Sequence, residues 1–112
     1  MGPLLIVDDE IAIRDTLSQL VGKDGREIIT ARDGQEALER LSKVPRPCLV
    51  LLDLMMPRMN GWEFLQHKSA DPLIADIPTI VLSASSRPAG AMHQLGKPFD
   101  VERLLALVDQ YC

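Results

Sequence analysis

The residues best suited to chemistry in this 112-residue chain are acidic and polar side chains that stand next to apolar runs. They are Asp8, Asp9, Asp53 and Ser83, together with the basic Lys97, which is expected to end a fifth strand. Three carboxylates brought to one spot repel one another unless a cation neutralises them. Sites built only of oxygen ligands suit Mg²⁺, which keeps several waters and takes phosphate oxygens as further ligands. A lysine ammonium and a serine hydroxyl would complete a cradle for a phosphoryl group, so the set predicts Mg²⁺-assisted phosphoryl chemistry.

Each of these residues also has an ordinary structural interpretation when it is taken alone. Asp8 and Asp9 precede a helical pattern and could cap that helix. Ser83 could satisfy backbone groups at a strand end, and Lys97 could be a solvated surface lysine. Asp53 is harder to explain in this way because it directly follows a buried apolar run, where an unpaired charge is costly. The prediction therefore rests on the combination and not on any single member.

Strand and helix patterns alternate along the sequence. Four short apolar runs are typical of strands: Leu4–Val7, Glu27–Ala31, Cys48–Leu52 and Pro78–Leu82. A fifth strand is expected before Lys97. Four helical patterns lie between and after these runs. The first has Ile13, Leu17, Leu20 and Val21 at helical spacing and stops near Gly25, and the second is opened by Asp33 or Gly34. The third is capped by Asn60, and the last is expected to turn Val101, Leu104, Leu105 and Val108 inward. This alternation predicts an α/β fold with a parallel sheet and helices on both faces. Ligands of such sheets bind beyond the carboxyl ends of the strands, where the polar residues stand.

Composition narrows the class of protein further. A hydrophobic content of 46% supports a packed core and argues against disorder. The formal net charge is −4 and no basic cluster is present, which argues against a nucleic-acid partner. No apolar run approaches the roughly 20 residues that span a bilayer, and the first residues lack the basic region of a signal peptide. We therefore expect one cytoplasmic domain over residues 1–112, without a membrane partner.

Cysteine and histidine add no second site to this interpretation. Cys48 and Cys112 make neither a disulfide framework nor a zinc pattern, and Cys48 is interpreted as a small buried hydrophobe. His67 and His93 lack metal-ligand spacing and are expected at the surface.

Four segments, taken in order, resemble the receiver domain of bacterial two-component response regulators. They are LLIVDDE at 4–10, LLDLMMPRMNG at 51–61, LSA at 82–84 and KPF at 97–99. The match covers nearly the whole chain, and the segment from Asp53 to Gly61 is highly specific. The resemblance implies a stand-alone receiver with a flavodoxin-like (CheY-like), doubly wound parallel sheet of five strands in the order 2-1-3-4-5.

The resemblance also implies roles for the acidic residues. Asp53 would be the phosphoacceptor. Asp9 and Asp53 would bind Mg²⁺ through their carboxylates and Met55 through its backbone carbonyl, while Asp8 would act on the metal mainly through bound water.

For the phosphoryl group, the resemblance implies Ser83 as a hydrogen-bonding residue and Lys97 as the cationic partner. The donor would be a sensor histidine kinase or phosphotransfer protein, or a small molecule such as acetyl phosphate. The domain would catalyse its own phosphorylation and later dephosphorylation at Asp53, and would signal by contacting an output protein that the sequence does not identify. A homodimer is left open.

The sequence departs from the family pattern between Ser83 and Lys97. These residues are only 14 positions apart, with Pro88 and Gly90 in the middle of the stretch, where relatives carry a whole helix. A parallel crossover usually needs about a dozen residues or more and commonly includes a helix. Because a full helix cannot fit in this stretch, we expect the fourth helix to be absent or vestigial. Gln94 stands where the family usually has an aromatic residue that moves on phosphorylation, so the signal is expected to pass through the 85–94 loop or another face.

Two other functions explain less of the sequence. A degenerate receiver that binds partners without phosphate would account for the altered output region, but a pure scaffold would gain stability by losing clustered carboxylates. A phosphatase for outside substrates would need a second acid/base residue and a substrate-binding cap, and the sequence offers neither.

Overall fold

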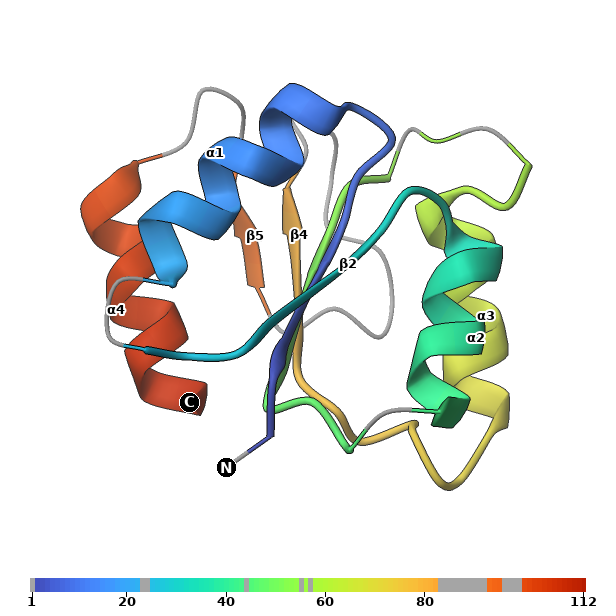
Figure 1. Ribbon diagram of the computed structural model, residues 1–112. Coiled ribbons are helices and arrows are strands. Elements are labelled where there is room, and N and C mark those ends of the chain that lie inside the picture. The colour runs from blue at the N-terminus through green and yellow to red at the C-terminus, as the bar shows by residue number, and fades with distance from the viewer. Residues whose placement is uncertain are drawn as a thin grey trace.

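Strands and helices alternate in the computed structural model, which describes residues 2–22, 25–43, 45–54, 56, 58–82, 93–95 and 100–112 (Figure 1). The strands are β1 (Leu4–Val7), β2 (Ile28–Ala31), β3 (Leu49–Leu52), β4 (Thr79–Leu82) and β5 (His93–Leu95). The helices are α1 (Ile11–Val21), α2 (Gly34–Lys43), α3 (Gly61–Ala70) and α4 (Val101–Tyr111). The expected α/β class is confirmed.

The described strands form one parallel sheet in the order β2-β1-β3-β4-β5, which confirms the predicted order. Its register aligns the last residues of β2, β1 and β3 and those of β4 and β5, while Leu52 at the end of β3 pairs with Val81, one residue before the end of β4. Val7 pairs with Ala31 on one side and with Leu52 on the other, and Leu82 pairs with Leu95. Because the strands end together, the residues that follow β1 and β3 share one edge of the sheet.

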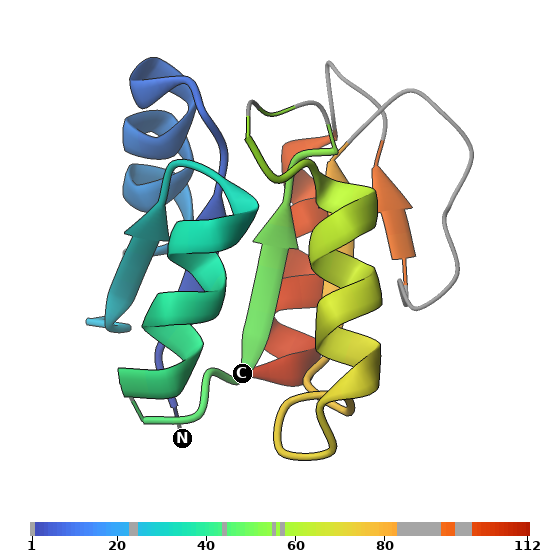
Figure 2. The ribbon, with the colours of Figure 1, turned by 90° about the vertical axis from the view of Figure 1, so that its right-hand side faces the viewer.

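Helices cover both faces of the sheet, with α1 and α4 on one face and α2 and α3 on the other (Figure 1 and Figure 2). Successive residues of β1 alternate between the two resulting cores: Leu4 and Ile6 pack with Leu104, whereas Leu5 packs with Phe64. Both faces are covered, which explains why β1 is apolar at every position. In the part of the chain that the structure describes, no helix is long and apolar enough to cross a membrane.

Several element ends differ slightly from the prediction. β2, β3 and β4 each begin one residue later than expected. The first helix ends at Val21 and not near Gly25, and the Gly22 N–H closes its last turn on the Ser18 carbonyl at 3.0 Å.

The inward face of α4 also needs a correction. Leu104 and Val108 are buried as predicted, but Val101 is 40% exposed. Val101 is the first residue of the helix, so no preceding turn covers its side chain. Leu107, which the prediction omitted, is buried in its place.

The expected loss of the fourth helix falls on residues 83–92, which lie outside the described residues, as does the side chain of Gln94. The next described element after β4 is β5, and the two strands pair in parallel. The helix labelled α4 is the last one in the chain, over Val101–Tyr111.

The two cysteines form a disulfide, so the expectation that they make no disulfide framework was wrong, as was the interpretation of Cys48 as a small buried hydrophobe. Cys48 and Cys112 are 64 positions apart in sequence, but their Cα atoms lie 5.4 Å apart. Cys48 directly precedes β3, and its N–H donates to the Pro3 carbonyl at 2.9 Å. Cys112 follows α4 and caps its last turn. Tertiary packing of α4 against the sheet brings the two ends together, and no spacing in the sequence reports that packing.

Lys68 of α3 is a buried cation. The residue is 2% exposed, and its Nζ donates to the Ala75 carbonyl at 3.0 Å. Burial lowers the pKa of the Lys68 ammonium group below its ordinary value of 10.5, and the negative charge of Asp76 offsets only part of that effect.

The buried ammonium group should make stability depend on pH in alkaline solution. Between the lowered pKa of folded Lys68 and the 10.5 of the unfolded chain, the unfolded state binds more protons. The contribution of Lys68 to the free energy of unfolding should therefore increase as the pH rises through that window. Urea unfolding of Lys68→Met should lack this contribution, whereas Lys43→Met, at an exposed position of α2, should retain it. An equal pH dependence in both variants would contradict the expectation.

Candidate functional site

Two acidic residues follow neighbouring strands at the carboxyl edge of the sheet. Asp8 comes directly after β1 and Asp53 directly after β3. The Asp53 N–H donates to the Val7 carbonyl at 2.9 Å, and the Asp8 N–H donates to the Ala31 carbonyl at 3.1 Å. The parallel hydrogen-bond pattern thus continues through both residues. Asp8 is 0% and Asp53 is 5% exposed, so the sheet edge holds two buried acids side by side.

Asp9 and Glu10 extend this acidic group towards solvent. One carboxylate oxygen from each of Asp8, Asp9 and Glu10 lies within 4.8 Å of the others, with Asp8 buried and the other two exposed. The Glu10 N–H also donates to Asp8 Oδ1 at 2.9 Å. Glu10 was not predicted as a site residue, although its position directly after the two aspartates was a signal for it.

Helix capping does not account for Asp8 and Asp9. The N-cap residue of α1 is Glu10, and its side chain makes no capping hydrogen bond within the described residues. Arg14 of α1 contacts the end of β1, because its Nη1 donates to the Asp8 backbone carbonyl at 2.7 Å. The pair of aspartates therefore needs another explanation.

The segment after Asp53 turns sharply into α3. The Gly61 N–H donates to the Leu54 carbonyl at 2.9 Å. Asn60 Oδ1 accepts from the Glu63 N–H, and the Glu63 carboxylate accepts from the Asn60 N–H, which makes a complete capping box. The predicted cap at Asn60 is confirmed, and it fixes the far end of the segment.

Gly61 leaves no room for a side chain in this turn. A Cβ atom there would lie 2.7 Å from Leu54 Cα and 2.8 Å from the Asp53 carbonyl oxygen. Because backbone atoms cannot move aside cheaply, Gly61→Ala should lower the free energy of unfolding by about 1–3 kcal/mol. Urea unfolding measures the loss, and Gln66→Ala, at an exposed position of the same helix, is the control. A Gly61→Ala variant as stable as the parent would show that the turn can widen.

Three predicted site residues, Met55, Ser83 and Lys97, lie outside the described residues. Their assignment continues to rest on the sequence. The described part of the site consists of Asp8, Asp9 and Asp53.

These three acids fit a hard divalent cation such as Mg²⁺. All their donor atoms are carboxylate oxygens, the ligand type that Mg²⁺ prefers over nitrogen or sulfur. Two of the carboxylates are buried and Asp9 faces solvent, so a cation at this edge could keep part of its water shell.

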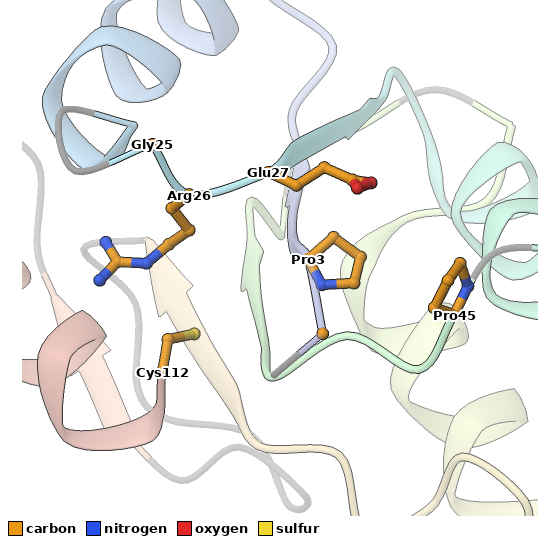
Figure 3. A pocket seen from close by; sticks show the side chains of 7 residues that line it. Pro3, Gly25, Arg26, Glu27, Pro45 and Cys112 are labelled. Carbon is orange, nitrogen blue, oxygen red and sulfur yellow. The ribbon is translucent and has the colours of Figure 1, made fainter.

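Figure 3 shows a cavity of about 430 Å³. It lies at the amino ends of β1, β2 and β3, at the opposite edge of the sheet from these acids. Its lining residues are Gly2, Pro3, Gly25, Arg26, Glu27, Pro45 and Cys112. The guanidinium of Arg26 already donates to the Val21 carbonyl at 2.9 Å and pairs with Asp109 at 3.3 Å. Cys112 is bonded to Cys48. Parallel sheets place ligands at the carboxyl ends of strands, so the acidic edge is the better candidate.

Comparison with known proteins shows which family the chain resembles. The family model of the response regulator receiver domain matches residues 4–109. The chain is 37% identical to the response regulator MprA of Mycolicibacterium vanbaalenii over 111 residues, which cover 92% of this chain and 47% of MprA. It is 34% identical to sporulation initiation phosphotransferase F of Bacillus subtilis over 116 residues, which cover 96% of this chain and 91% of that protein.

Solved structures show the same likeness. The chemotaxis protein CheY4 of Vibrio cholerae matches with a TM-score of 0.86 and 32% identity, over 100% of this chain and 99% of that one. The receiver domain of a histidine kinase from Syntrophus aciditrophicus matches with a TM-score of 0.88 and 28% identity, over 99% of this chain and 89% of that one. The chain spans about half the length of several curated relatives, MprA among them.

Proposed function

The chain belongs to the response regulator receiver domain family, and on that premise we propose that Asp53 is the residue that accepts the phosphoryl group. The observation that carries this proposal is the position of Asp53, a buried acid at the carboxyl end of β3 beside buried Asp8. A carboxylate at such a strand end can reach a ligand beyond the sheet edge while β1 and β3 hold its backbone in place.

Asp53 would act as the nucleophile. One of its carboxylate oxygens attacks phosphorus and forms the acyl phosphate, while the bond from phosphorus to the donor breaks and the donor keeps its electron pair. Ser83 and Lys97 are proposed to hold the phosphoryl oxygens through a hydroxyl and an ammonium group. Later attack of water on phosphorus would return the carboxylate and release inorganic phosphate.

Asp9, Asp53 and the Met55 carbonyl are proposed to hold Mg²⁺, with Asp8 acting through water. When bound, the ion would neutralise negative charge that develops on the transferring group. The chain's own contribution is a fixed geometry: the Asp53 and Asp8 backbones are both hydrogen-bonded to neighbouring strands, which holds the two carboxylates at one edge.

Receiver domains take phosphoryl groups from histidine kinases and act on output partners, and we propose both for this chain. The relative whose name marks it as a phosphotransferase is matched over nearly its whole length, which supports a receiver domain over residues 1–112. We further propose a cytoplasmic location and partners that are proteins and not nucleic acid. The net charge of −4 supports that choice of partner.

The test is intact mass spectrometry after incubation with acetyl phosphate or phosphoramidate and Mg²⁺. We expect the protein to gain the mass of one phosphoryl group and to lose it again on standing. Omission of Mg²⁺ should suppress the gain. A chain that binds Mg²⁺ tightly but never gains a phosphoryl group would overturn the proposal.

A further inference from the structure

We infer that Asp33 and Arg58 form an ionic clamp that positions the segment after Asp53, and thereby tunes metal binding at the acidic edge. The inference rests on the proposed function for its effect on Mg²⁺, but the clamp itself is defined by described residues. Asp33 directly precedes α2, and Arg58 lies between β3 and α3. Both are positioning residues, since neither is proposed to touch the metal.

The clamp joins a buried carboxylate to a half-exposed cation. The Asp33 side chain is 2% exposed and the Arg58 side chain 58% exposed, with Arg58 Nη2 lying 2.7 Å from Asp33 Oδ2. The other oxygen, Asp33 Oδ1, accepts from the Glu36 N–H at 2.8 Å. One carboxylate therefore holds the first turn of α2 and the segment after β3 at the same time.

The backbone of Arg58 points to the same conclusion. Its φ is 60°, the left-handed region, and it is the one non-glycine residue with positive φ among those described. A side chain in that region costs backbone energy and persists only where the surroundings hold it. The contact with buried Asp33 supplies a reason for an arginine to remain there.

A second contact makes the junction close-fitting. The Gly34 N–H donates to the Met59 carbonyl at 3.0 Å. A Cβ on Gly34 would lie 2.8 Å from both Met59 Cγ and the Met59 carbonyl oxygen, so α2 begins directly against the residue after Arg58. The segment is thus held at Leu54 by Gly61 and at residues 58 and 59 by the start of α2. Asp53 lies directly before this segment. The clamp would therefore affect the metal site through the position of Asp53.

Long-range charge and positioning make opposite predictions for Arg58 and the same prediction for Asp33. If only long-range charge matters, Arg58→Ala removes a positive charge and should strengthen Mg²⁺ binding, whereas Asp33→Asn removes a negative charge and should weaken it. If the pair positions the segment, both changes should weaken Mg²⁺ binding, by about tenfold as for other residues that support metal ligands. Asp33→Asn keeps the oxygen that caps α2, so the helix start should survive.

The experiment is isothermal titration calorimetry of the full chain with MgCl₂. Arg32→Ala is the matched control, because Arg32 forms an exposed ion pair with Glu36 of the same helix at 3.5 Å. We expect Arg58→Ala and Asp33→Asn to weaken binding alike, the double variant to be little worse than either, and Arg32→Ala to bind as the parent does. Opposite signs for the two single variants, or no change in either, would overturn the inference.

Arg58→Gly separates the side chain from the backbone. Glycine adopts the left-handed conformation freely, so this variant loses the clamp without keeping the strain. Mg²⁺ binding as weak as that of Arg58→Ala supports the ion pair as the cause, and binding like that of the parent contradicts it.

Hydrogen exchange in metal-free protein provides a readout that does not depend on the proposed function. Loss of the clamp should speed amide exchange of residues 58–61 in Arg58→Ala relative to Arg32→Ala. If the parent neither binds Mg²⁺ nor gains a phosphoryl group, the proposed function fails while this measurement still tests the clamp. If the parent does both and exchange is unchanged in Arg58→Ala, the clamp fails alone.

Discussion

Asp53→Ala should abolish phosphoryl incorporation completely. The variant has no carboxylate oxygen to attack phosphorus at the end of β3, and Asp8 would act on Mg²⁺ and not on the phosphoryl group. Intact mass spectrometry after treatment with acetyl phosphate and Mg²⁺ should therefore show only the unmodified chain. Mg²⁺ should raise the melting temperature of the parent, because a ligand that binds only the folded state stabilises that state. Asp53→Ala removes a proposed Mg²⁺ ligand and should therefore lose most of this rise.

The control for this result is Asp15→Ala. Asp15 is an exposed acid on α1, so its loss should leave both phosphoryl gain and the Mg²⁺ effect unchanged. Phosphoryl gain that survives in Asp53→Ala would place the acceptor elsewhere and would contradict the proposed function. Loss in both variants would indicate damage to the fold, which circular dichroism can detect.

The acidic edge could be predicted because it depends on local pattern and on one general rule. An unbroken apolar run of four residues indicates a strand covered on both faces, and β1 and β3 are both buried throughout. Parallel strands of an α/β sheet end at a common edge, so the acids that follow them, Asp8 and Asp53, meet there. Neither step needs knowledge of how distant segments pack in detail.

The clamp and the disulfide could not be predicted in that way. Asp33 was interpreted as the opening of a helix, which is correct for Oδ1, but its other oxygen pairs with Arg58 only because the start of α2 packs against the segment after β3. The left-handed backbone of Arg58 is likewise a product of that packing. Cys48, before β3, and Cys112, after α4, come together for the same kind of reason. Such contacts depend on how distant segments pack against one another in detail. Residue types and their spacing in the sequence do not predict that packing.

Reduction of the Cys48–Cys112 bond should lower the free energy of unfolding by about 2–4 kcal/mol, since the bond closes a long loop and restricts the unfolded chain. Urea unfolding with and without dithiothreitol measures the difference. Cys112→Ser should unfold like the reduced parent and should not respond to the reductant. A parent whose stability is the same in both conditions would show that the bond contributes nothing.

The location of the bond predicts which property survives its reduction. It ties the end of α4 to the start of β3, at the edge of the sheet opposite Asp8 and Asp53. The core beneath α4 does not depend on the bond, because Leu104 and Val108 are buried against β1 and β3 residues such as Ile6 and Leu51. Reduced protein should therefore stay folded at moderate temperature and gain a phosphoryl group at Asp53 at the parent rate. Disulfides in the cytoplasm are usually reduced or transient, so the reduced form is the one expected to carry the signal if the proposed cytoplasmic location holds. A phosphorylation rate that falls on reduction would instead mean that the end of α4 is coupled to the acidic edge through the sheet.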